Sequence, residues 1–335
     1  MKISIAMATY NGAKYIREQL ESLASQTVKP SELVICDDGS TDKTLEIIED
    51  FAKFSPFIVH LHRNPKRMNY ASNFLKAASL CTGDIIAYCD QDDVWLSNKL
   101  EKCSTPFLDP KVVLVVHDNT LVNEELKELN NSRLRPVSKS RIANSLNTNP
   151  FLLFYGHTMI FSRILLNFIP QERPKSLLGD YPQSHEEIVY LFANVLGRIA
   201  FLKESFCLYR QHCSNASGMF KEGNAIQKSL KTGGLDYQQH AKVFCAYATY
   251  LRDLAPKYEL DIQEKLILAA IFYDQVSQSL KCRSSLYQAT KSYEKFSRFT
   301  AMLLRNTYRS RNQAGLGAKS LLKDFSEVVL GGIKA

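Results

Sequence analysis

The chain has 335 residues, of which 45% are hydrophobic and 23% are charged, as in a globular protein with a substantial core. No apolar run reaches the roughly 18 to 20 residues that a membrane-spanning helix needs. The eight cysteines form no Cys-x-x-Cys pair, which argues against a zinc site or a disulfide framework, and the N-terminus shows no signal-peptide pattern. We therefore expect a protein of the cytoplasm.

The net charge of +8 is unevenly placed along the chain. Residues 1–218 hold 24 of the 42 Lys+Arg and 24 of the 34 Asp+Glu, so 18 basic and 10 acidic residues remain for 219–335. Within 276–323, ten basic residues face Glu294 alone. This asymmetry indicates membrane headgroups, nucleic acid or a polyanionic acceptor as partner, and a solvated basic helix face is the alternative.

The first 120 residues alternate between strand and helix patterns. Strands are expected at 3–8, 33–36, 57–61, 84–89 and 112–116, and helices at 13–25, 42–54 and 70–80. Repeated strand–helix–strand units predict an α/β fold, with a mostly parallel sheet and helices on both faces.

The rest of the chain is less regular at first and then becomes helical. Residues 123–150 are polar and indicate a long loop or lid, 156–161 are apolar, and a helix at 186–196 precedes a strand at 199–202. Apolar residues at helical spacing predict helices at 237–254, 260–280 and 286–304. We therefore expect an α/β domain at 1–218 and a helical, basic extension at 219–335.

Polar clusters follow three of the predicted strands, at 9–12, 37–40 and 90–93. Ligands of open parallel sheets bind beyond the carboxyl ends of the strands, so we expect these clusters to converge at one edge.

The cluster Asp90-Gln91-Asp92-Asp93 places three carboxylates within four residues. Such repulsion needs a cation or hydrogen-bond donors to offset it. Oxygen ligands favour Mg²⁺ or Mn²⁺, which commonly bridge carboxylates and substrate phosphates. The alternative is an acidic turn in which Asp93 caps a helix at 94–100.

The cluster at 37–42 combines a turn with a free carboxylate. Gly39 permits a tight turn, and Ser40 or Asp42 can cap the next helix. Neither role uses Asp38, whose carboxylate could accept from the N–H of a uracil or thymine ring. Thr9 and Asn11 could reach the same base or its ribose.

These segments resemble the N-terminal signature of glycosyltransferase family 2. The resemblance is carried by 9–12, 26–30, 37–42 and 90–96, and it continues through Gly156-His157-Thr158-Met159 and His185-Glu186-Glu187 to Tyr209-Arg210-Gln211-His212 with Asn215. It covers residues 3–218 and is closest to bacterial rhamnosyltransferase-like members. It implies the GT-A fold, inversion at the transferred sugar and a nucleotide-diphosphate sugar donor.

The resemblance also implies roles for individual residues. Asp38 would hold the base, while Thr9, Tyr10 and Asn11 would line the nucleotide pocket. Asp90 would face ribose and metal-bound phosphate, Asp92 would bind Mn²⁺ or Mg²⁺, and Asp93 would contact hydroxyls of the donor sugar.

The remaining roles fall on the later segments. Glu186 would be the catalytic base, although the family more often carries Asp there and Glu187 follows it. His212 would be a metal ligand or a diphosphate donor, or else a structural residue at a strand end. Arg210 would bind the diphosphate or pair with an acidic neighbour.

We therefore predict a metal-dependent, inverting glycosyltransferase that uses a UDP- or dTDP-sugar, with rhamnose as the suggested sugar. The acceptor would be a saccharide or lipid-linked saccharide of a bacterial surface glycan. Residues 276–323 would hold the enzyme peripherally on the inner face of the plasma membrane, and no nucleic-acid partner is expected. A nucleotidyltransferase acting on sugar phosphates is the alternative, but residues 8–13 lack its usual Gly-rich, basic phosphate loop.

Overall fold

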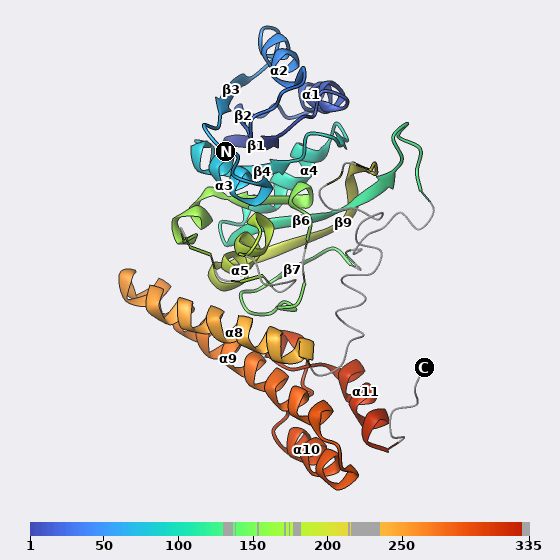
Figure 1. Ribbon diagram of the computed structural model, residues 1–335. Coiled ribbons are helices and arrows are strands. Elements are labelled where there is room, and N and C mark those ends of the chain that lie inside the picture. The colour runs from blue at the N-terminus through green and yellow to red at the C-terminus, as the bar shows by residue number, and fades with distance from the viewer. Residues whose placement is uncertain are drawn as a thin grey trace.

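The first four predicted strands form the parallel half of a single sheet (Figure 1). They are β1 (Ile3–Thr9), β2 (Glu32–Asp37), β3 (Ile58–Arg63) and β4 (Ile85–Cys89), in the spatial order β3-β2-β1-β4. All three pairings among them are parallel. This computed structural model describes residues 1–129, 137, 139–152, 154–170, 172–173, 175–176, 182–213, 215 and 235–329.

The other half of the sheet is mixed. The strand β8 (Met159–Ser162) runs antiparallel to both β4 and β6 (Val112–Val122), and β6 pairs in parallel with β9 (Arg198–Arg210). The short strands β5 (Val94–Trp95) and β7 (Arg141–Ala143) pair antiparallel with β9. The predicted α/β fold is confirmed, with the parallel strands gathered in the N-terminal half.

Helices cover both faces of the sheet because alternate side chains of each strand point to opposite sides. One face packs against α1 (Ile16–Ala24), α2 (Thr44–Ala52) and α4 (Lys99–Ser104), and its core contains Ile5, Met7 and Ile35. The other face packs against α3 (Tyr70–Leu80) and α5 (His185–Leu196).

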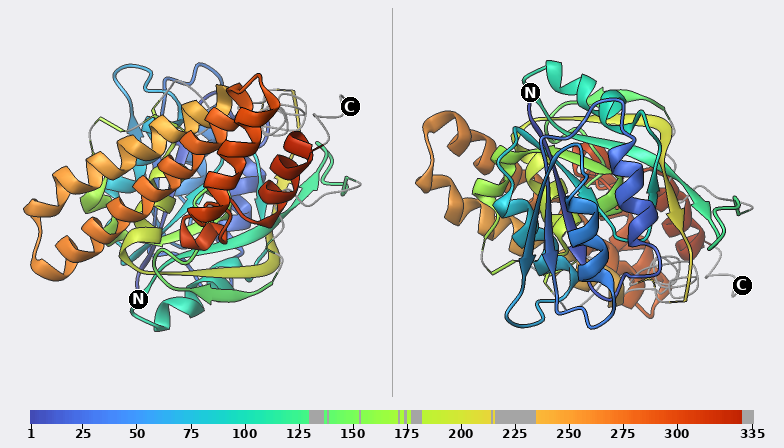
Figure 2. Two further views of the ribbon diagram at one scale, coloured as in Figure 1. Left: turned by 90° about the horizontal axis from the view of Figure 1, so that it is seen from below. Right: turned by 90° about the horizontal axis from the view of Figure 1, so that it is seen from above.

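The C-terminal helices extend this second core. They are α8 (Leu235–Leu254), α9 (Leu260–Gln288), α10 (Ser292–Leu304) and α11 (Ala318–Val329). The helices α8 and α9 lie side by side (Figures 1 and 2), and in the view of Figure 1 they lie below α5. Phe244 and Tyr273 stack on each other, and Asn194 of α5 donates to the Tyr273 hydroxyl at 3.3 Å. One continuous apolar cluster therefore joins the sheet to these helices.

Several element boundaries differ from the sequence predictions. Residues 94–95 form β5, and the following helix begins at Lys99 after Asn98, so the prediction that Asp93 caps a helix at 94–100 is wrong. The helix expected to begin at 286 is preceded by α9, which continues to Gln288. The predicted lid and the boundary at 218 lie partly or wholly outside the described residues.

Within the described part of the chain, no helix is both long and apolar enough to cross a membrane.

Candidate active site

The loops that follow β1, β2 and β4 meet at one edge of the sheet, as predicted. Thr9 pairs with Asp37 at the ends of their strands, and Met7 pairs with Cys89. The Tyr10 N–H donates to Oε1 of Gln91 at 3.0 Å, and the Asn11 N–H donates to the Ser40 hydroxyl at 2.9 Å. The three polar clusters therefore form one surface.

Gln91 and Gly12 determine how closely two of these loops approach. The Gln91 side chain also donates from Nε2 to the Tyr10 carbonyl at 3.1 Å, so it binds both polar groups of that backbone unit. A Cβ atom on Gly12 would lie 2.3 Å from Oε1 of Gln91. Glycine is required there because any larger residue would displace the bridging amide.

The residues expected to line the nucleotide pocket differ in exposure. Thr9 is buried and donates its hydroxyl to Oδ2 of Asp37 at 2.8 Å, so this hydroxyl is engaged within the protein. Tyr10 and Asn11 are exposed, and the Arg67 guanidinium lies 3.9 Å from the centre of the Tyr10 ring. The accessible part of the predicted pocket wall therefore consists of Tyr10, Asn11 and their neighbours.

Asp38 lies just inside the edge and accepts two hydrogen bonds on one oxygen. Its Oδ1 accepts from the Met68 N–H at 2.8 Å and from Nδ2 of Asn64 at 2.9 Å. Neither bond uses the second carboxylate oxygen. The residue is 5% exposed, so its position is fixed before any ligand binds.

Asp92 and His212 form the best candidate metal pair. Oδ2 of Asp92 lies 2.9 Å from Nε2 of His212, and the two side chains are 15% and 6% exposed. Carboxylate oxygen and imidazole nitrogen are both ligands of first-row divalent cations. Asp90 is more exposed, at 34%, and stands two residues away. The donor set therefore fits an Mn²⁺ or Mg²⁺ ion that Asp92 and His212 would hold.

Asp93 points into the protein. It has no exposed surface and its Oδ1 accepts from the Arg210 N–H at 3.1 Å. Its pKa is raised to about 7, chiefly by burial and also by the charges of Asp92 and Asp90, against the opposing effect of His157. This placement does not fit the predicted contact with donor hydroxyls, because a ligand cannot reach the carboxylate.

His157 links the acidic cluster to the segment after residue 150. Its Nδ1 lies 3.1 Å from Oδ2 of Asp90 and 3.5 Å from Oδ2 of Asp93, and Nδ2 of Asn119 lies 2.8 Å from its Nε2. Burial opposes ionisation of Asp90, but the hydrogen bond to His157 and the nearby charges of His157, His185 and Lys99 together outweigh it and lower that pKa. No individual role was predicted for His157, although it lies in a segment that carries the family resemblance. Its imidazole side chain, which can bind carboxylates, was the signal that could have indicated one.

A second possible ion site lies beneath the surface. Ligand atoms of Asp93, His157 and Cys207 all lie within 4.8 Å of one another. Burial raises the pKa of the Cys207 thiol well above its usual value, which disfavours the thiolate that a metal binds. The pair of Asp92 and His212, in which Asp92 is partly exposed, is therefore the stronger candidate.

Arg210 is committed to contacts within the protein. Its Nε donates to the Asp92 carbonyl at 2.9 Å, Nη1 donates to the Glu124 carbonyl, and Nη2 pairs with Glu18. Its guanidinium also lies 4.7 Å from the centre of the Tyr15 ring. This arrangement does not fit the predicted diphosphate contact and agrees with the alternative, pairing with an acidic neighbour.

The two glutamates at the start of α5 have different surroundings. Glu187 completes a capping box, since Ser184 accepts from its N–H and its own Oε2 accepts from the Ser184 N–H at 3.0 Å. Its Oε1 accepts from the Ser176 hydroxyl at 2.8 Å. The Glu186 side chain is 21% exposed instead, and its Oε2 lies 2.8 Å from Nδ1 of His185. Glu186 therefore has the accessible carboxylate.

His185 is held in an aromatic box. Its ring stacks on Phe74 with 4.2 Å between ring centres and meets Tyr88 edge-on at 4.7 Å. A Cβ atom on Gly156 would lie 2.4 Å from its Nε2, so only glycine leaves room for the ring. Burial opposes ionisation of Glu186, but the interaction with His185 outweighs it and lowers that pKa.

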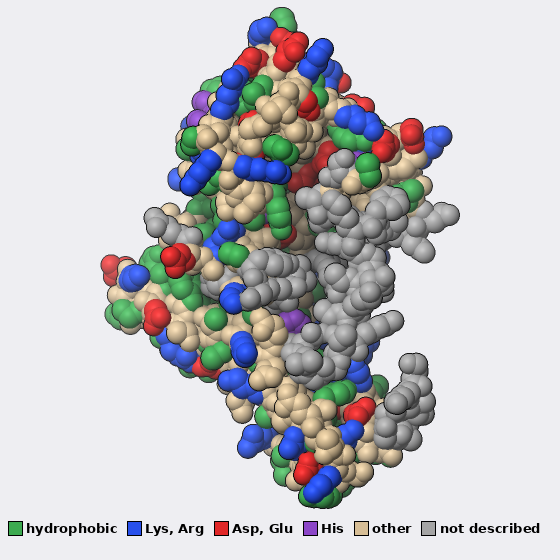
Figure 3. Space-filling view, viewed as in Figure 1, with side chains coloured by type: hydrophobic (Ala, Val, Ile, Leu, Met, Phe, Trp, Pro, Cys, Tyr) green, Lys and Arg blue, Asp and Glu red, His purple; other side chains and the backbone are tan. Residues whose placement is uncertain are grey.

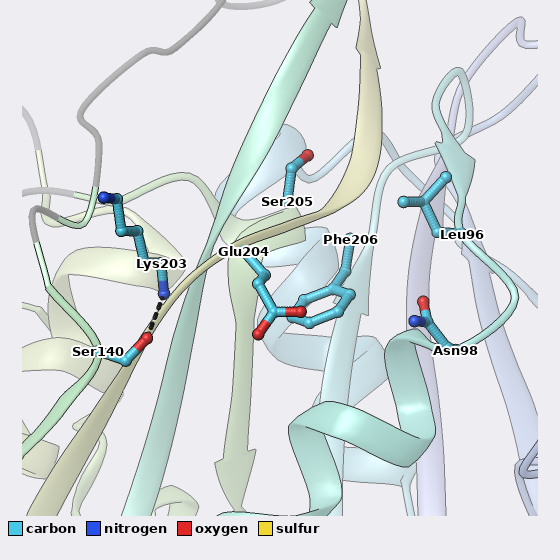
Figure 4. Close-up of a pocket in the computed structure, with 7 residues that line it drawn as sticks. All are labelled: Leu96, Asn98, Ser140, Lys203, Glu204, Ser205 and Phe206. Carbon is cyan, nitrogen blue, oxygen red and sulfur yellow. Dashed lines mark hydrogen bonds between the residues drawn. The ribbon is translucent and has the colours of Figure 1, made fainter.

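The segment 156–157 therefore joins both halves of the site, because Gly156 adjoins His185 and His157 adjoins Asp90. Figure 3 shows acidic side chains in a recess on one face of the molecule. A separate pocket of about 550 Å³ is lined by residues around β9 and includes Glu204 and Phe206 (Figure 4). No predicted site residue lines it.

Comparison with known proteins agrees with this arrangement. Residues 4–168 match the family model of glycosyl transferase family 2. An uncharacterized glycosyltransferase of Nostoc is 27% identical over 241 residues, which cover 70% of this chain and 73% of that protein. A second relative is the Escherichia coli UDP-Glc:alpha-D-GlcNAc-diphosphoundecaprenol beta-1,3-glucosyltransferase WfaP. It is 25% identical over 249 residues, which cover 73% of this chain and 91% of that protein.

Among solved structures, residues 1–349 of Staphylococcus aureus TarS have a similar fold. The structure in complex with UDP aligns over 92% of this chain and 93% of that one, with a TM-score of 0.53 and 18% identity. A further structure of the same protein contains UDP-GlcNAc. At this identity the likeness concerns the fold alone, which is of the GT-A kind, and the match to glycosyl transferase family 2 covers residues 4–168.

Proposed function

We propose that this chain is an inverting, metal-dependent glycosyltransferase that moves a sugar from a UDP- or dTDP-sugar to a growing bacterial surface glycan. The proposal is supported by the shared sheet edge of the loops that carry Asp38 and Asp92, and by Gly156 and His157, which lie against His185 and Asp90 respectively. A nucleotide, a metal-bound diphosphate and an acceptor hydroxyl need three carboxylates close together, which we propose to be Asp38, Asp92 and Glu186.

The nucleotide end of the site would be formed by the loops after β1 and β2. The free oxygen of Asp38 would accept from the N–H of a uracil or thymine ring, and its fixed position would favour that contact. Tyr10 and Asn11 are exposed next to it, where they would contact the base or ribose. UDP in the TarS structure is consistent with this assignment for a protein of similar fold.

The diphosphate end would be formed by Asp90, Asp92 and His212. A divalent ion at Asp92 and His212 would neutralise the departing diphosphate, which is the chemistry such an ion supplies. Asp90, exposed and kept ionised by His157, would face the ribose and the metal-bound phosphate.

Glu186 would act as the general base. Its lowered pKa keeps the carboxylate ionised at neutral pH, as a group that accepts a proton from an acceptor hydroxyl must be. Single displacement by that hydroxyl would invert the transferred sugar. Because Glu187 already accepts hydrogen bonds from Ser184 and Ser176, Glu186 is the stronger candidate of the two.

The most specific parts of the proposal are the identities of the donor sugar and of the acceptor. Resemblance to rhamnosyltransferase-like members supports a dTDP-rhamnose donor, while the name of WfaP supports a UDP-hexose and an acceptor linked to diphosphoundecaprenol. A lipid-linked saccharide is the acceptor that we propose.

The test is release of nucleoside diphosphate from a panel of UDP- and dTDP-sugars in the presence of saccharide acceptors. We expect release with Mn²⁺ or Mg²⁺ and its loss on chelation, with restoration when the ion returns. Formation of a nucleotide sugar from a sugar phosphate and a nucleoside triphosphate, without release from any donor, would overturn the proposal in favour of a nucleotidyltransferase.

A further inference from the structure

The two last described helices expose apolar faces to solvent. On α10, Tyr293, Phe296, Leu303 and Leu304 are exposed, with exposed fractions of 63% for Phe296 and 83% for Leu304. They recur at intervals of three, seven and one residues, which places them on one stripe of the helix. Helices of a globular protein normally turn such a stripe inward, so its exposure requires an explanation.

The helix α11 presents a second stripe of the same kind. Leu322, Phe325 and Val329 are spaced by three and four residues and are 69%, 51% and 56% exposed. Phe325 lies 6.2 Å from Phe299 between ring centres. Because Phe299 lies between Phe296 and Leu303 at helical spacing, it borders the α10 stripe, and the two stripes therefore adjoin.

Buried contacts fix the outward direction of the α11 stripe. Asp324, which lies on the opposite side of the helix from Leu322, is fully buried and pairs with Arg283 of α9 at 2.8 Å. The hydroxyls of Tyr287 and Tyr308 both donate to the same carboxylate at 2.9 Å. These contacts hold α11 by its polar side and leave its apolar side to solvent.

Basic side chains surround this apolar face. Lys291 and Arg305 flank the two ends of α10, and Lys319 and Lys323 lie beside the α11 stripe, all of them exposed. The acidic residues of the described segment 291–329 are neutralised, since Glu294 and Glu327 lie near Arg298 and Lys295 and Asp324 is buried. Figure 3 shows Lys and Arg side chains spread over this end of the molecule.

Four of the ten basic residues of 276–323 do not contribute an unpaired, exposed charge to this surface. Arg283 is buried, Lys295 and Arg298 are paired, and Arg311 is partly buried with its guanidinium 5.4 Å from the centre of the Phe151 ring. The charge that remains is concentrated around the apolar stripes.

We propose that the α10–α11 face docks on an anionic phospholipid membrane, with the apolar stripes inserted at the level of the headgroups. An amphipathic helix with aromatic and leucine residues on one face and lysines beside it is typical of such binding. Anionic headgroups complement the basic rim, whereas a second copy of the chain would bring two basic rims together. The inference rests on the proposed function only in its purpose, which is to bring the enzyme to a lipid-linked acceptor.

The experiment is sedimentation of the full chain with vesicles of phosphatidylcholine, with and without phosphatidylglycerol. We expect binding to the anionic vesicles and much weaker binding to the neutral ones. The double substitution Phe296→Ser with Leu322→Ser should lower the partition coefficient at least about tenfold. Lys319→Gln with Lys323→Gln should lower it about five-fold for each lysine on anionic vesicles, with little effect on neutral vesicles.

Phe54→Ser with Leu108→Ser is the matched control, because these residues are 90% and 81% exposed in the sheet domain. Circular dichroism verifies that each variant is folded. Unchanged binding of the Phe296/Leu322 variant would overturn the inference. A concentration-dependent dimer that the same two substitutions abolish would also overturn it, since the face would then be an interface between copies. Failure of the proposed transferase activity would appear in nucleotide release with a water-soluble saccharide and would leave vesicle binding unchanged.

Discussion

Two groups of buried or half-buried charges in this protein are organised in opposite ways. At the sheet edge, Asp90, Asp92 and Asp93 lie together with the imidazoles of His157 and His212, so carboxylates outnumber permanent cations. Between α9 and α11, the Asp324 carboxylate pairs with Arg283 and accepts hydrogen bonds from two tyrosine hydroxyls. Arg283 also donates to the Ser320 hydroxyl. The first group has unbalanced charge and partial exposure, and the second has balanced charge on a buried ion pair.

The difference separates a binding site from a structural lock. Neighbouring carboxylates that outnumber nearby cations repel each other and oppose folding unless a bound cation offsets their charge. Their presence near the surface therefore indicates a cation and a phosphate-bearing ligand. A buried ion pair whose hydrogen bonds are satisfied binds nothing further and holds two helices in one arrangement. Of the following predictions, Asp92→Ala and Arg283→Met each change one member of one group, and the others change glutamates outside both groups.

Asp92→Ala should have the largest effect on activity. Removing the exposed carboxylate would take away the proposed metal ligand, and we expect nucleotide release to fall by about a thousandfold or more. The fold should persist, because the balance of charge at the edge becomes less repulsive. Steady-state rates with Mn²⁺ measure the effect, and Asp253→Ala, an exposed carboxylate on α8, is the control. Full activity of Asp92→Ala would exclude the metal role.

Glu186→Gln and Glu187→Gln distinguish the two neighbouring glutamates. Loss of a general base should lower kcat by about 10²- to 10⁴-fold in Glu186→Gln, with donor KM little changed. Glu187→Gln should instead lower stability by about 1 kcal/mol, because it weakens the capping box with Ser184. Kinetics and urea unfolding of both variants measure this, and the reverse pattern would make Glu187 the base.

Arg283→Met should have the largest effect on stability. It leaves Asp324 buried without its cation, and removal of one partner of a buried pair typically costs about 3 to 5 kcal/mol. Urea unfolding measures the change against Arg305→Met, which alters an exposed arginine. The transferase rate per folded molecule should be unchanged; a selective loss of rate would connect this lock to the active site.

Glu32→Gln should give a small effect on stability, and one that depends on pH. Oε1 of this buried carboxylate accepts from the Ser4 hydroxyl and the Thr82 N–H, both at 2.6 Å. Burial opposes ionisation, but these hydrogen bonds outweigh it and lower the pKa of Glu32. A lowered folded-state pKa stabilises the fold above the unfolded-state value and loses that contribution as pH falls through the folded-state value.

We therefore expect Glu32→Gln to lower the free energy of unfolding by about 1 to 2 kcal/mol at pH 7, with the deficit shrinking below about pH 4. Urea unfolding at several pH values measures it, with the exposed Glu46→Gln as control. A difference in unfolding free energy that stays constant with pH would show that the ionised form of Glu32 contributes no stability beyond the packing of its side chain. Glu32 lies in the same sheet as the candidate active site, but its carboxylate accepts hydrogen bonds from protein donors. The variant therefore tests whether a carboxylate whose hydrogen bonds are all made within the protein stabilises the fold.

Much of the fold and part of the site could be predicted from local sequence. Strand patterns of alternate or continuous apolar residues predicted β1, β2 and β4, and the rule for parallel sheets then predicted that the loops at 9–12, 37–40 and 90–93 meet. Prediction failed where a later strand decided the outcome. The alternative in which residues 94–95 start a helix is wrong, because pairing with β9 makes them a strand.

Side-chain direction was the other source of error. Asp92 and Asp93 are adjacent in sequence, yet only Asp92 faces His212, while Asp93 turns inward to Arg210 and His157. Arg210 was predicted to bind the diphosphate or to pair with an acidic neighbour, and Glu18 and two backbone carbonyls engage all three of its guanidinium nitrogens. Contacts with residues far away in the sequence, up to 192 positions for Glu18 and Arg210, determine both outcomes.

The amino-acid sequence by itself determined the α/β alternation, the acidic strand end, the order of the motifs and the excess of positive charge after residue 218, because each depends on residue types at short spacing. Only the tertiary structure decided which carboxylate is exposed, which glutamate is free of the helix cap, and which basic residues remain at the surface. Those outcomes depend on long-range partners that compete for the same polar atoms, and burial makes that competition decisive because an unsatisfied polar group inside a protein is strongly unfavourable.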